Sequence, residues 1–350
     1  MKILVIQQKM IGDVLTSTIL FEALKEKYPE AELHYLINSH TVSVVENNPF
    51  IDDYIVFTPE IEKQYLKFWG LIKSIRSNKY DVVIDAYSKL SSHILSGFSK
   101  AKTKISYRKK YRSFIYDYNI VRKTHTKLAK GIEIDNRLKL LEPLGISAKN
   151  IKPKIYLTNK ELENSKLYLE NNGINTNAKL FMISVLGSSN SKTYPLPYMA
   201  QLIDAIVEAT KGQLLFNYIP SQVAQAKAVF NLCKPKTQQH IRFDVFGKNL
   251  REFLAITKYC TALIGNEGGA TNMAKALDVP TFSIFAPWID KEGWNMFEDN
   301  THVSVHLIDT KPELFTGKRL KETKGDAQPN YEAFLPEYIL PTLSKYLNQF

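Results

Sequence analysis

Residues 1–20, MKILVIQQKMIGDVLTSTIL, form the stretch that decides the fold. The apolar run Met1–Ile6 is typical of a buried strand, a short polar loop follows it, and the apolar spacing after Gly12 predicts a helix. Asp13 therefore lies at the turn from a strand into a helix. In open α/β sheets ligands bind where strands end and helices begin, so Asp13 is a candidate general base. The alternative is that Asp13 only caps the helix, since aspartate is a favoured N-cap residue.

Length and composition indicate a two-domain globular protein. At 350 residues the chain exceeds the size at which single cores stop growing, and 44% hydrophobic with 23% charged residues is typical of globular proteins. The two cysteines, Cys233 and Cys260, cannot form a disulfide framework, which favours a reducing cytoplasm. No apolar run approaches the roughly 18 residues of a membrane span, and the N-terminal run breaks at Gln7, too early for a signal peptide. We therefore expect a cytoplasmic location.

Positive charge is concentrated in one window, residues 100–130. Eight lysines and three arginines occur there with a single acid, Asp117, so the window carries +10 of the chain's net charge of +11. Four tyrosines and a phenylalanine are interleaved with these bases. The window is a candidate site for nucleic acid, for an anionic membrane surface, or for a phosphorylated or carboxylated substrate. A solvated basic face is the alternative.

Strand-like and helix-like stretches alternate in two series, which predicts parallel sheets covered by helices on both faces. In the first series the predicted strands are residues 31–37, 54–57 and 80–87, and the predicted helices are residues 14–27, 60–77 and 126–143. In the second series the predicted strands are residues 180–185, 213–219, 241–246, 261–264 and 281–285, and the predicted helices are residues 196–210, 221–232, 249–258, 270–277 and 331–347. A polar linker at residues 145–160 separates the two series. We therefore predict an α/β fold with two Rossmann-like domains facing a central cleft, residues 1–155 and 156–328, and a terminal helical segment, residues 329–350.

Two loops have the composition of phosphate-binding sites. A strand-like run ends in the glycine turn Gly265–Gly269 and opens a helix, whose first N–H groups offer an anion site. Strand 180–185 ends in a loop with hydroxyl and ammonium donors, namely Gly187, Ser188, Ser189 and Lys192. Each loop taken alone is equally consistent with ordinary turn chemistry, because glycine and serine are common turn residues.

Motifs for metals and for serine hydrolysis are missing from the sequence. It has no D-x-D, H-E-x-x-H or paired C-x-x-C spacing and no G-x-S-x-G elbow. His302 and His306 are four residues apart, but their alternating surroundings favour a strand over a metal pair. We expect no metal and no cofactor, so lysine, hydroxyl groups and helix dipoles would have to meet any phosphate charge.

Taken together, these blocks resemble glycosyltransferase family 9, the lipopolysaccharide heptosyltransferases. Residues 1–15 resemble the family's N-terminal block, residues 187–195 its phosphate loop and residues 265–288 its C-terminal signature. The stretch from His125 through Arg137 to Gly145 matches the family's exit from the first domain. The resemblance implies the GT-B fold, whose terminal helix crosses back to the first domain. It also implies inverting, metal-independent transfer of a sugar from a nucleotide diphosphate sugar to an acidic lipid-linked saccharide.

Site residues follow from the same resemblance. Asp13 is implied as the catalytic base, Lys192 as the catalytic cation at the leaving phosphate and Glu267 as a donor contact. The other implied donor contacts are Gly187, Ser188, Ser189, Asn266, Gly268, Gly269, Ala270, Thr271 and Asn272. The acceptor contacts are expected at Gly12, next to the base, and at four bases of the basic window, whose charge would bind the acceptor's phosphates or carboxylates: Arg108, Lys109, Lys110 and Arg112. Because a helix N-terminus stabilises a carboxylate's charge, Asp13 would be a weak base that works when the acceptor proton leaves late.

On the donor side the chain departs from the family. Where the family usually has Gly-Asn-Asp-Thr-Gly-Pro-Met-His, residues 265–272 read Gly-Asn-Glu-Gly-Gly-Ala-Thr-Asn. The donor is thus left open between ADP-heptose, the family's commonest choice, and other nucleotide sugars. Two rival functions remain: a nucleotide-sugar 2-epimerase, which needs no lipid acceptor, and a nucleic-acid-binding protein, for which no recognised motif occurs. We expect contact with an anionic inner-membrane surface through the basic window, and no nucleic-acid partner.

Overall fold

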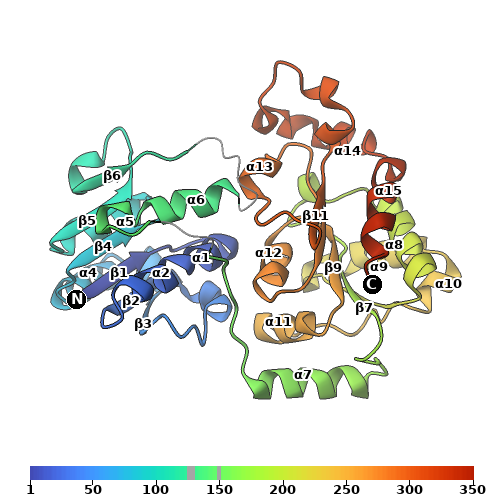
Figure 1. Ribbon diagram of the computed structural model, residues 1–350, viewed down its shortest axis with the longest axis horizontal. Coiled ribbons are helices and arrows are strands. Elements are labelled where there is room, and N and C mark those ends of the chain that lie inside the picture. The colour runs from blue at the N-terminus through green and yellow to red at the C-terminus, as the bar shows by residue number, and fades with distance from the viewer. Residues whose placement is uncertain (124–130, 148–150) are drawn as a thin grey trace. The chain divides into compact units, whose positions relative to one another are not determined.

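Two compact units make up the computed structural model, which describes residues 1–123, 131–147 and 151–350 (Figure 1). The first unit is Met1–Tyr156 and the second is Leu157–Phe350. Each unit contains a parallel sheet with helices on both of its faces (Figure 1). Among the helices of the described residues, none has the length and hydropathy that a membrane span requires.

The sheet of the first unit has the strand order β3-β2-β1-β4-β5-β6 and is parallel throughout. Its strands are β1 (Lys2–Ile6), β2 (Glu32–Asn38), β3 (Asp53–Phe57), β4 (Val82–Asp85), β5 (Thr103–Tyr107) and β6 (Tyr118–Ile120). β1 lies inside the sheet, where Ile6 pairs with Leu36 on one side and with Asp85 on the other. Because β1 is covered on both faces, residues 3–6 are all apolar and buried. Residues that follow β1 therefore emerge at the middle of the sheet's carboxyl edge.

The helices of the first unit are shorter than the apolar spacing predicted. They are α1 (Ile11–Ser17), α2 (Ile19–Lys27), α3 (Pro59–Lys63), α4 (Tyr65–Ser77), α5 (Leu90–Phe98) and α6 (Ile132–Lys139), with 3-10 turns η1 (Ser39–Val44), η2 (Ser113–Ile115) and η3 (Glu142–Leu144). The prediction of one helix over 14–27 is wrong: the Thr18 hydroxyl donates to the Leu15 carbonyl at 2.7 Å, and the helix breaks there. The predicted helix 60–77 is interrupted at Gln64. Of the predicted helix 126–143, residues 126–130 lie outside the described residues.

The sheet of the second unit has the order β11-β10-β9-β7-β8 and is also parallel. Its strands are β7 (Leu180–Ser184), β8 (Gln213–Phe216), β9 (Ala262–Asn266), β10 (Thr281–Ile284) and β11 (His302–Val305). Its helices are α7 (Asn159–Asn171), α8 (Leu196–Thr210), α9 (Val223–Leu232), α10 (Pro235–Gln238), α11 (Leu250–Lys258), α12 (Gly269–Ala276), α13 (Lys291–Trp294), α14 (Ala327–Glu332) and α15 (Pro336–Leu347). Its 3-10 turns are η4 (Asn190–Lys192), η5 (Pro220–Gln222), η6 (Leu307–Asp309), η7 (Pro312–Phe315) and η8 (Leu320–Asp326).

Two predictions for the second unit are wrong in detail. The predicted strand 241–246 is a single bridge between Leu214 and Ile241. Past this bridge the chain turns, and the ring of Phe243 stacks on Tyr218 with the centroids 5.1 Å apart. The predicted helix 331–347 is two helices, because a residue that precedes a proline disfavours helical backbone and Pro336 starts α15. α15 packs on α8 and β11 within the second unit, and the expected crossing of this segment to the first domain stays a prediction.

One ion pair fixes α7 to α11 and gives the second unit an acid-sensitive contact. Arg251 donates from Nε to Glu161 Oε1 at 2.6 Å and from Nη2 to Oε2 at 2.7 Å. The same carboxylate accepts bonds from the backbone N–H and the hydroxyl of Thr158, the N-cap of α7. The Arg251 hydrogen bond, followed by those from Thr158, lowers the pKa of Glu161 from 4.5 to about 2, although partial burial opposes the shift.

We expect this contact to stabilise the protein above pH 4.5 and to be lost as the pH falls toward about 2, because the unfolded state takes up the proton first. Urea unfolding of the wild type and of Glu161→Gln at several pH values measures the effect. The difference between their free energies of unfolding should be present at pH 6 and shrink steadily below pH 4.5. A difference that stays constant between pH 6 and pH 3 would contradict the assignment.

Candidate active site

Asp13 lies in the first turn of α1, directly behind the carboxyl end of β1. The N-cap of α1 is Met10, and no side chain caps this helix, so the capping alternative for Asp13 is wrong. The Asp13 side chain is 25% exposed, which leaves its carboxylate accessible to a ligand. The carbonyl of the neighbouring Gly12 accepts a hydrogen bond from the Thr16 hydroxyl at 2.7 Å. Asp13 is thus a partly exposed carboxylate that a helix start presents at the edge of the sheet.

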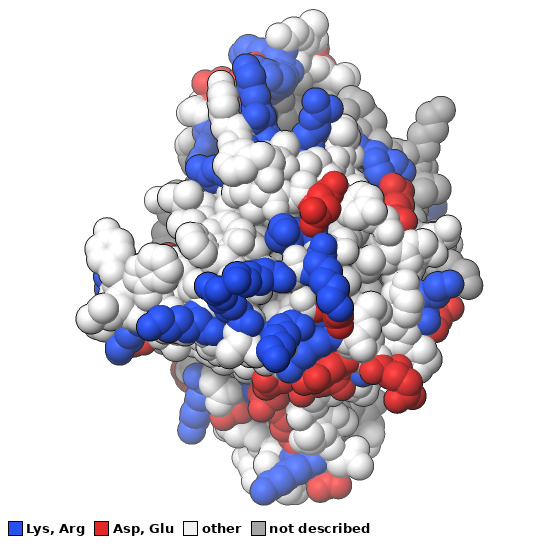
Figure 2. Space-filling model, turned by 90° about the vertical axis from the view of Figure 1, so that its left-hand side faces the viewer, with Lys and Arg blue, Asp and Glu red and all other residues white. Residues whose placement is uncertain are grey.

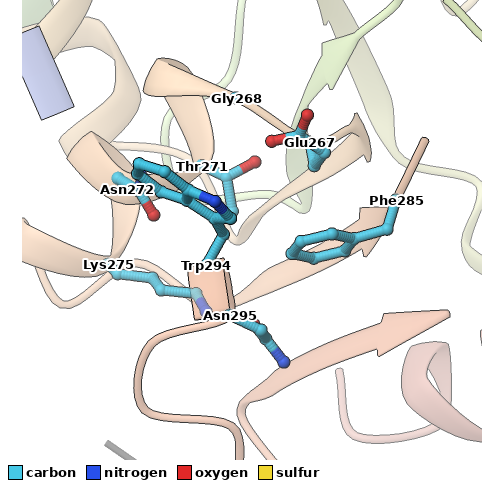
Figure 3. A pocket seen from close by; sticks show the side chains of 8 residues that line it. All are labelled: Glu267, Gly268, Thr271, Asn272, Lys275, Phe285, Trp294 and Asn295. Carbon is cyan, nitrogen blue, oxygen red and sulfur yellow. Dashed lines mark hydrogen bonds between the residues drawn. The ribbon is translucent and has the colours of Figure 1, made fainter. Parts of the chain in front are cut away.

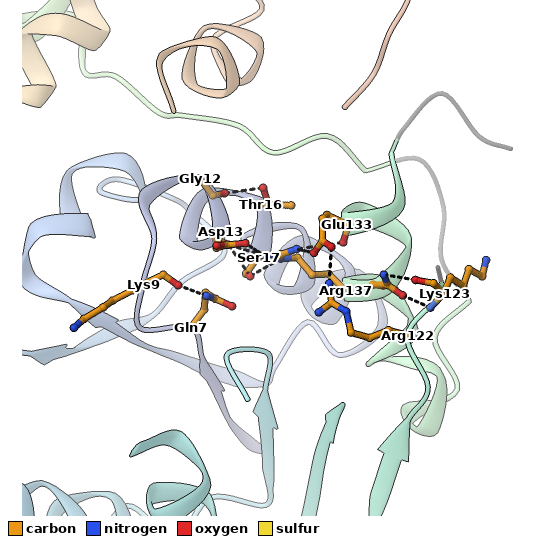
Figure 4. Close-up of polar contacts among 11 residues, drawn as sticks. Gln7, Lys9, Gly12, Asp13, Thr16, Ser17, Arg122, Lys123, Glu133 and Arg137 are labelled. Carbon is orange, nitrogen blue, oxygen red and sulfur yellow. Dashed lines mark hydrogen bonds and ion pairs between the residues drawn. The ribbon is translucent and has the colours of Figure 1, made fainter. Parts of the chain in front are cut away.

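A buried arginine holds this carboxylate in place (Figure 4). Arg137 of α6 donates from Nη2 to Asp13 Oδ1 at 2.5 Å and from Nε to the Ser17 hydroxyl at 2.9 Å. Its Nη1 donates to Glu133 Oε2 at 2.9 Å. The guanidinium is only 4% exposed. Burial alone would lower the pKa of Arg137, but the charge of Asp13 and further partners outweigh burial and raise it, so Arg137 stays charged. Sequence reasoning placed Arg137 in a family motif but found no role for it.

The basic window divides into paired and unpaired bases. Four of its bases contact acids: Lys102 with Asp81, Lys104 with Asp117, Arg122 with Glu133, and Lys123 with Asp135. The predicted acceptor contacts Arg108, Lys109, Lys110 and Arg112 lie in the segment after β5, and within the described part of the chain no carboxylate pairs with them. His125, Lys127 and Lys130 lie outside the described residues. Fewer bases are therefore available to a ligand than the sequence predicted. These bases come after β5, at the carboxyl end of the parallel strands, which is also where Asp13 lies.

A buried cluster beneath these bases anchors their segment to the sheet. The Tyr116 hydroxyl, which follows η2, donates to Asp85 Oδ2 at 2.5 Å, and His93 Nδ1 lies 2.6 Å from the same hydroxyl. Burial raises the pKa of Asp85 to about 6, although the bonds from Tyr116 and from the Ser88 N–H oppose the rise. Burial lowers the pKa of His93 to about 4, so its ring is neutral at pH 7. No sequence pattern indicated this cluster, because it joins β4, α5 and the segment before β6.

In the second unit, the loop after β7 is tightly folded around its own backbone. The Thr193 hydroxyl accepts from the Gly187 N–H at 3.0 Å and donates to the Ser189 carbonyl at 2.9 Å. A Cβ at Gly187 would lie 2.1 Å from the Lys192 carbonyl oxygen, so only glycine fits. Asn266, at the end of β9, accepts from the Tyr194 N–H at 2.7 Å and donates to the Ser184 carbonyl at 3.0 Å. The Asn266 side chain thus holds both ends of the loop, which is a different use from the direct donor contact that the resemblance implied.

Lys192 meets Glu267 and an indole that sequence reasoning missed. Its Nζ lies 3.2 Å from Glu267 Oε1 and 5.6 Å from the centre of the Trp288 ring. Trp288 donates from Nε1 to the Ser191 carbonyl at 2.7 Å, and Lys324 of η8 approaches the same ring to 4.9 Å. Two ammonium groups therefore converge on one indole beside exposed Ser188 and Ser189. Because Lys324 is far from this loop along the chain, no sequence motif indicated the second cation.

A pocket opens at the N-terminal end of α12 (Figure 3). It is lined by Glu267, Gly268, Thr271, Asn272, Lys275, Phe285, Trp294 and Asn295. The Thr271 hydroxyl is buried and has no hydrogen-bond partner among the described residues. Lys275 is engaged, since its Nζ donates to Asn295 Oδ1 at 2.9 Å and to the Met296 carbonyl. Trp294 is half exposed beside the pocket. The first N–H groups of α12, at Gly269 and Ala270, lie at this end of the helix, where no intrahelical acceptor exists for them.

The two histidines that are four residues apart have structural roles. His302 Nδ1 lies 3.2 Å from the Thr281 hydroxyl, and His306 Nδ1 accepts from the Ile308 N–H at 3.0 Å. In the part of the chain that the structure describes, no three His, Cys, Asp or Glu side chains gather as metal ligands.

Comparisons with known proteins identify the family of this chain. The sequence model of Glycosyltransferase family 9 (heptosyltransferase) matches residues 24–323. Lipopolysaccharide heptosyltransferase 1 of Campylobacter coli is 24% identical over 345 residues, which cover 93% of this chain and 92% of the relative.

Two solved structures share the fold over the whole chain. The glycosyl transferase family 9 protein of Veillonella parvula has a TM-score of 0.77 at 17% identity, covering 100% of this chain and 97% of its own. The ADP-heptose lipopolysaccharide heptosyltransferase II of Escherichia coli has a TM-score of 0.75 at 16% identity, covering 100% and 99%. These matches confirm the predicted GT-B type of α/β fold, built on two parallel sheets. The chain therefore belongs to glycosyltransferase family 9, and it is a heptosyltransferase-like glycosyltransferase.

Proposed function

We propose that this enzyme transfers heptose from ADP-heptose to an acidic, lipid-linked saccharide of the lipopolysaccharide-core type, with inversion and without a metal. The observation that carries the proposal is the partly exposed Asp13 carboxylate, which the buried Arg137 holds at the carboxyl edge of the first sheet. The family match starts at residue 24, so the role of Asp13 depends on this geometry and on the resemblance of residues 1–15. The Escherichia coli protein with the same fold is an ADP-heptose lipopolysaccharide heptosyltransferase, which supports the choice of donor.

Donor binding is assigned to the loop after β7 and to the start of α12. Lys192, Ser188 and Ser189 supply donors for the diphosphate, and the N–H groups of Gly269 and Ala270 add the positive end of a helix. The sugar is assigned to the surface beside this pocket, where the Glu267 and Asn272 side chains can form hydrogen bonds with its hydroxyl groups. Asparagine at 272 and glutamate at 267 distinguish this pocket from the usual family sequence and are expected to set the choice of sugar.

The proposed reaction is a single displacement. The acceptor hydroxyl oxygen forms a bond to the anomeric carbon as the bond from that carbon to the diphosphate oxygen breaks, and the hydroxyl proton passes to Asp13. The negative charge that develops on the diphosphate is stabilised by Lys192, by the serine hydroxyls and by the start of α12. The nucleotide sugar is a substrate in this reaction, and no cofactor is proposed.

The acceptor is assigned to the first unit. Arg108, Lys109, Lys110 and Arg112 would bind its phosphate or carboxylate groups at the sheet edge that carries Asp13, with Gly12 close to the attacking hydroxyl. A lipid-linked acceptor also requires peripheral contact of this cytoplasmic enzyme with the inner membrane. No role for nucleic acid is proposed, since four of the bases in the window are engaged with acids.

A thermal-shift panel tests the donor assignment. ADP and ADP-heptose should raise the melting temperature, because a ligand at 100 times its Kd stabilises the native state by about 2.7 kcal/mol. Adenosine, which lacks the diphosphate, should give a much smaller shift at the same concentration. Equal shifts from UDP- or GDP-sugars would contradict the choice of ADP-heptose. Conversion of a nucleotide sugar into its epimer without any acceptor would overturn transfer in favour of an isomerase.

A further inference from the structure

Large apolar side chains are exposed on one layer of the first unit. They are Tyr65, Leu66 and Trp69 of α4, Phe98 of α5, and Tyr111 and Phe114 in the segment between β5 and β6, and we name these six residues the apolar face. Tyr65, Leu66 and Phe114 are each 87% exposed. Contiguous exposed apolar side chains of this kind are unusual on a monomeric globular protein, and they mark a surface that binds a membrane or another molecule.

The three elements that carry the apolar face lie side by side. α4 packs against α5, and α5 packs against η2. The Trp69 and Phe98 rings meet edge to face with their centroids 5.6 Å apart. A Cβ at Gly97 would lie 3.7 Å from Cγ2 of Ile115, so the residue before Phe98 nearly touches the residue after Phe114. The inner sides of these helices are already used, since Leu71, Ile72, Ile75 and Leu95 belong to the core. The apolar face is therefore a separate, outward-facing surface.

The elements that carry the apolar face bear charge of one sign, although Glu60 and Glu62 of α3 lie just before Tyr65 and Glu62 pairs with Lys9. Residues 65–77, 90–98 and 108–116 contain seven lysines and arginines and no aspartate or glutamate. Within the described residues, Lys109 and Lys110 form no ion pair with a carboxylate, and Lys110 lies 5.5 Å from the ring centre of Tyr111. Figure 2 shows Lys and Arg side chains gathered on one face of the molecule beside broad uncharged surface, with Asp and Glu largely in a separate band. An aromatic surface with several cations beside it complements an anionic lipid bilayer, whose headgroups attract lysine and whose interface accepts aromatic rings.

We infer that the apolar face inserts into the interface of an anionic phospholipid bilayer. Insertion would turn the α4–α5–η2 layer toward the lipid and bring the bases that follow β5 to the headgroups. The inference deepens the proposed function, because it names the surface by which the enzyme reaches a lipid-linked acceptor. Its support is independent of the chemistry, since it depends on exposure and charge alone.

Cosedimentation of the full-length protein with vesicles tests the inference. Vesicles of phosphatidylcholine mixed with phosphatidylglycerol should bind the protein, and vesicles of phosphatidylcholine alone should bind it much more weakly. The double variant Leu66→Ser/Phe114→Ser should lose about tenfold or more in partition onto anionic vesicles, because two largely exposed apolar side chains no longer insert. Lys109→Ser/Lys110→Ser should lose roughly fivefold for each charge and should flatten the salt dependence.

A matched control is available in the second unit. Leu167 on α7 and Leu232 on α9 are 57% and 50% exposed, so Leu167→Ser/Leu232→Ser removes exposed apolar surface outside the apolar face and should bind like the wild type. The control removes less exposed apolar surface than Leu66→Ser/Phe114→Ser does, and unchanged melting temperatures of all these surface variants should verify folding. Equal loss in the control, or unchanged binding of Leu66→Ser/Phe114→Ser, would overturn the inference.

The oligomeric state and the thermal shift with ADP also test the assignment of the apolar face to lipid. If the wild type is a dimer in solution and Leu66→Ser/Phe114→Ser makes it a monomer that has lost no vesicle binding, the apolar face is an interface between copies and the lipid assignment fails. The thermal shift with ADP should be the same in the wild type and in Leu66→Ser/Phe114→Ser. Because vesicle binding is measured without a sugar donor, it fails or succeeds independently of the proposed transfer reaction.

Discussion

Replacing Asp13 with asparagine should lower turnover by about 100-fold or more, because asparagine cannot accept the proton of the acceptor hydroxyl. The amide oxygen of asparagine can still accept the bond from Arg137 Nη2, so the geometry at the start of α1 is retained. Arg137 also keeps its contact with Glu133 and is not left as an isolated buried charge. The loss should therefore appear in kcat rather than in the KM for the donor. Steady-state transfer assays that vary each substrate separately measure this effect.

Two controls accompany the Asp13→Asn assay: a measurement of folding and the same substitution at an acid outside the site. The melting temperature should change little, since the surroundings of α1 keep their hydrogen bonds. Asp244→Asn, which removes an exposed acid from the second unit, should transfer at the wild-type rate. Near-normal turnover of Asp13→Asn would show that the carboxylate serves only to neutralise Arg137. In that case the base would have to be sought elsewhere at the same sheet edge.

Replacing Lys192 with methionine should lower kcat/KM for the donor by about 100-fold, because one charged stabiliser of the leaving diphosphate is lost. Methionine keeps an apolar stem near Trp288, so the packing of the loop is largely preserved. Glu267, which pairs with Lys192 in the wild type, becomes an unpaired carboxylate beside the site and adds to the loss by repelling the donor. Both the kinetic parameter and the thermal shift produced by ADP should decrease.

Lys321→Met is the control for Lys192→Met. Lys321 is an exposed lysine of η8, and its removal changes the net charge equally without touching the loop after β7. It should leave donor kinetics unchanged. If Lys192→Met and Lys321→Met lost donor affinity to the same extent, the effect would be one of overall charge, and Lys192 would have no specific role.

The sequence predicted the buried central strands and the helices of the second unit well, but it missed β5 and β6, which lie in the basic window, and it misplaced the ends of several helices. Buried parallel strands such as β1, β7 and β9 are continuous apolar runs, which are easily recognised. Local events end helices: the Thr18 hydroxyl bonds to a backbone carbonyl, and Pro336 prevents α14 and α15 from joining. Residues 241–246 alternate like a strand, yet the aromatic residue Phe243 finds its partner in Tyr218 and the chain turns away after one bridge.

The sequence indicated only those residues of the candidate active site that belong to short local motifs. Asp13, Lys192 and Glu267 each belong to a short sequence motif with a recognisable composition, and the structure brings Lys192 and Glu267 together. The partner of Asp13 is 124 positions away along the chain, and no spacing rule connects them. Trp288 and Lys324 were missed for the same reason, because their relation to the phosphate loop exists only in three dimensions. The positive charge that the basic window can offer to a ligand was overestimated, because sequence composition does not show which bases pair with acids in the folded protein.

The chain has only three tryptophans, and each lies at a different place where binding is proposed. Trp69 belongs to the apolar face, Trp288 lies under the Lys192 and Lys324 ammonium groups, and Trp294 lines the pocket beside α12. Indole emission shifts to shorter wavelength in an apolar medium, so the protein carries its own fluorescent reporters. Variants that keep a single indole would report contact with lipid, with diphosphate and with the sugar as three separate optical signals, with no dye attached.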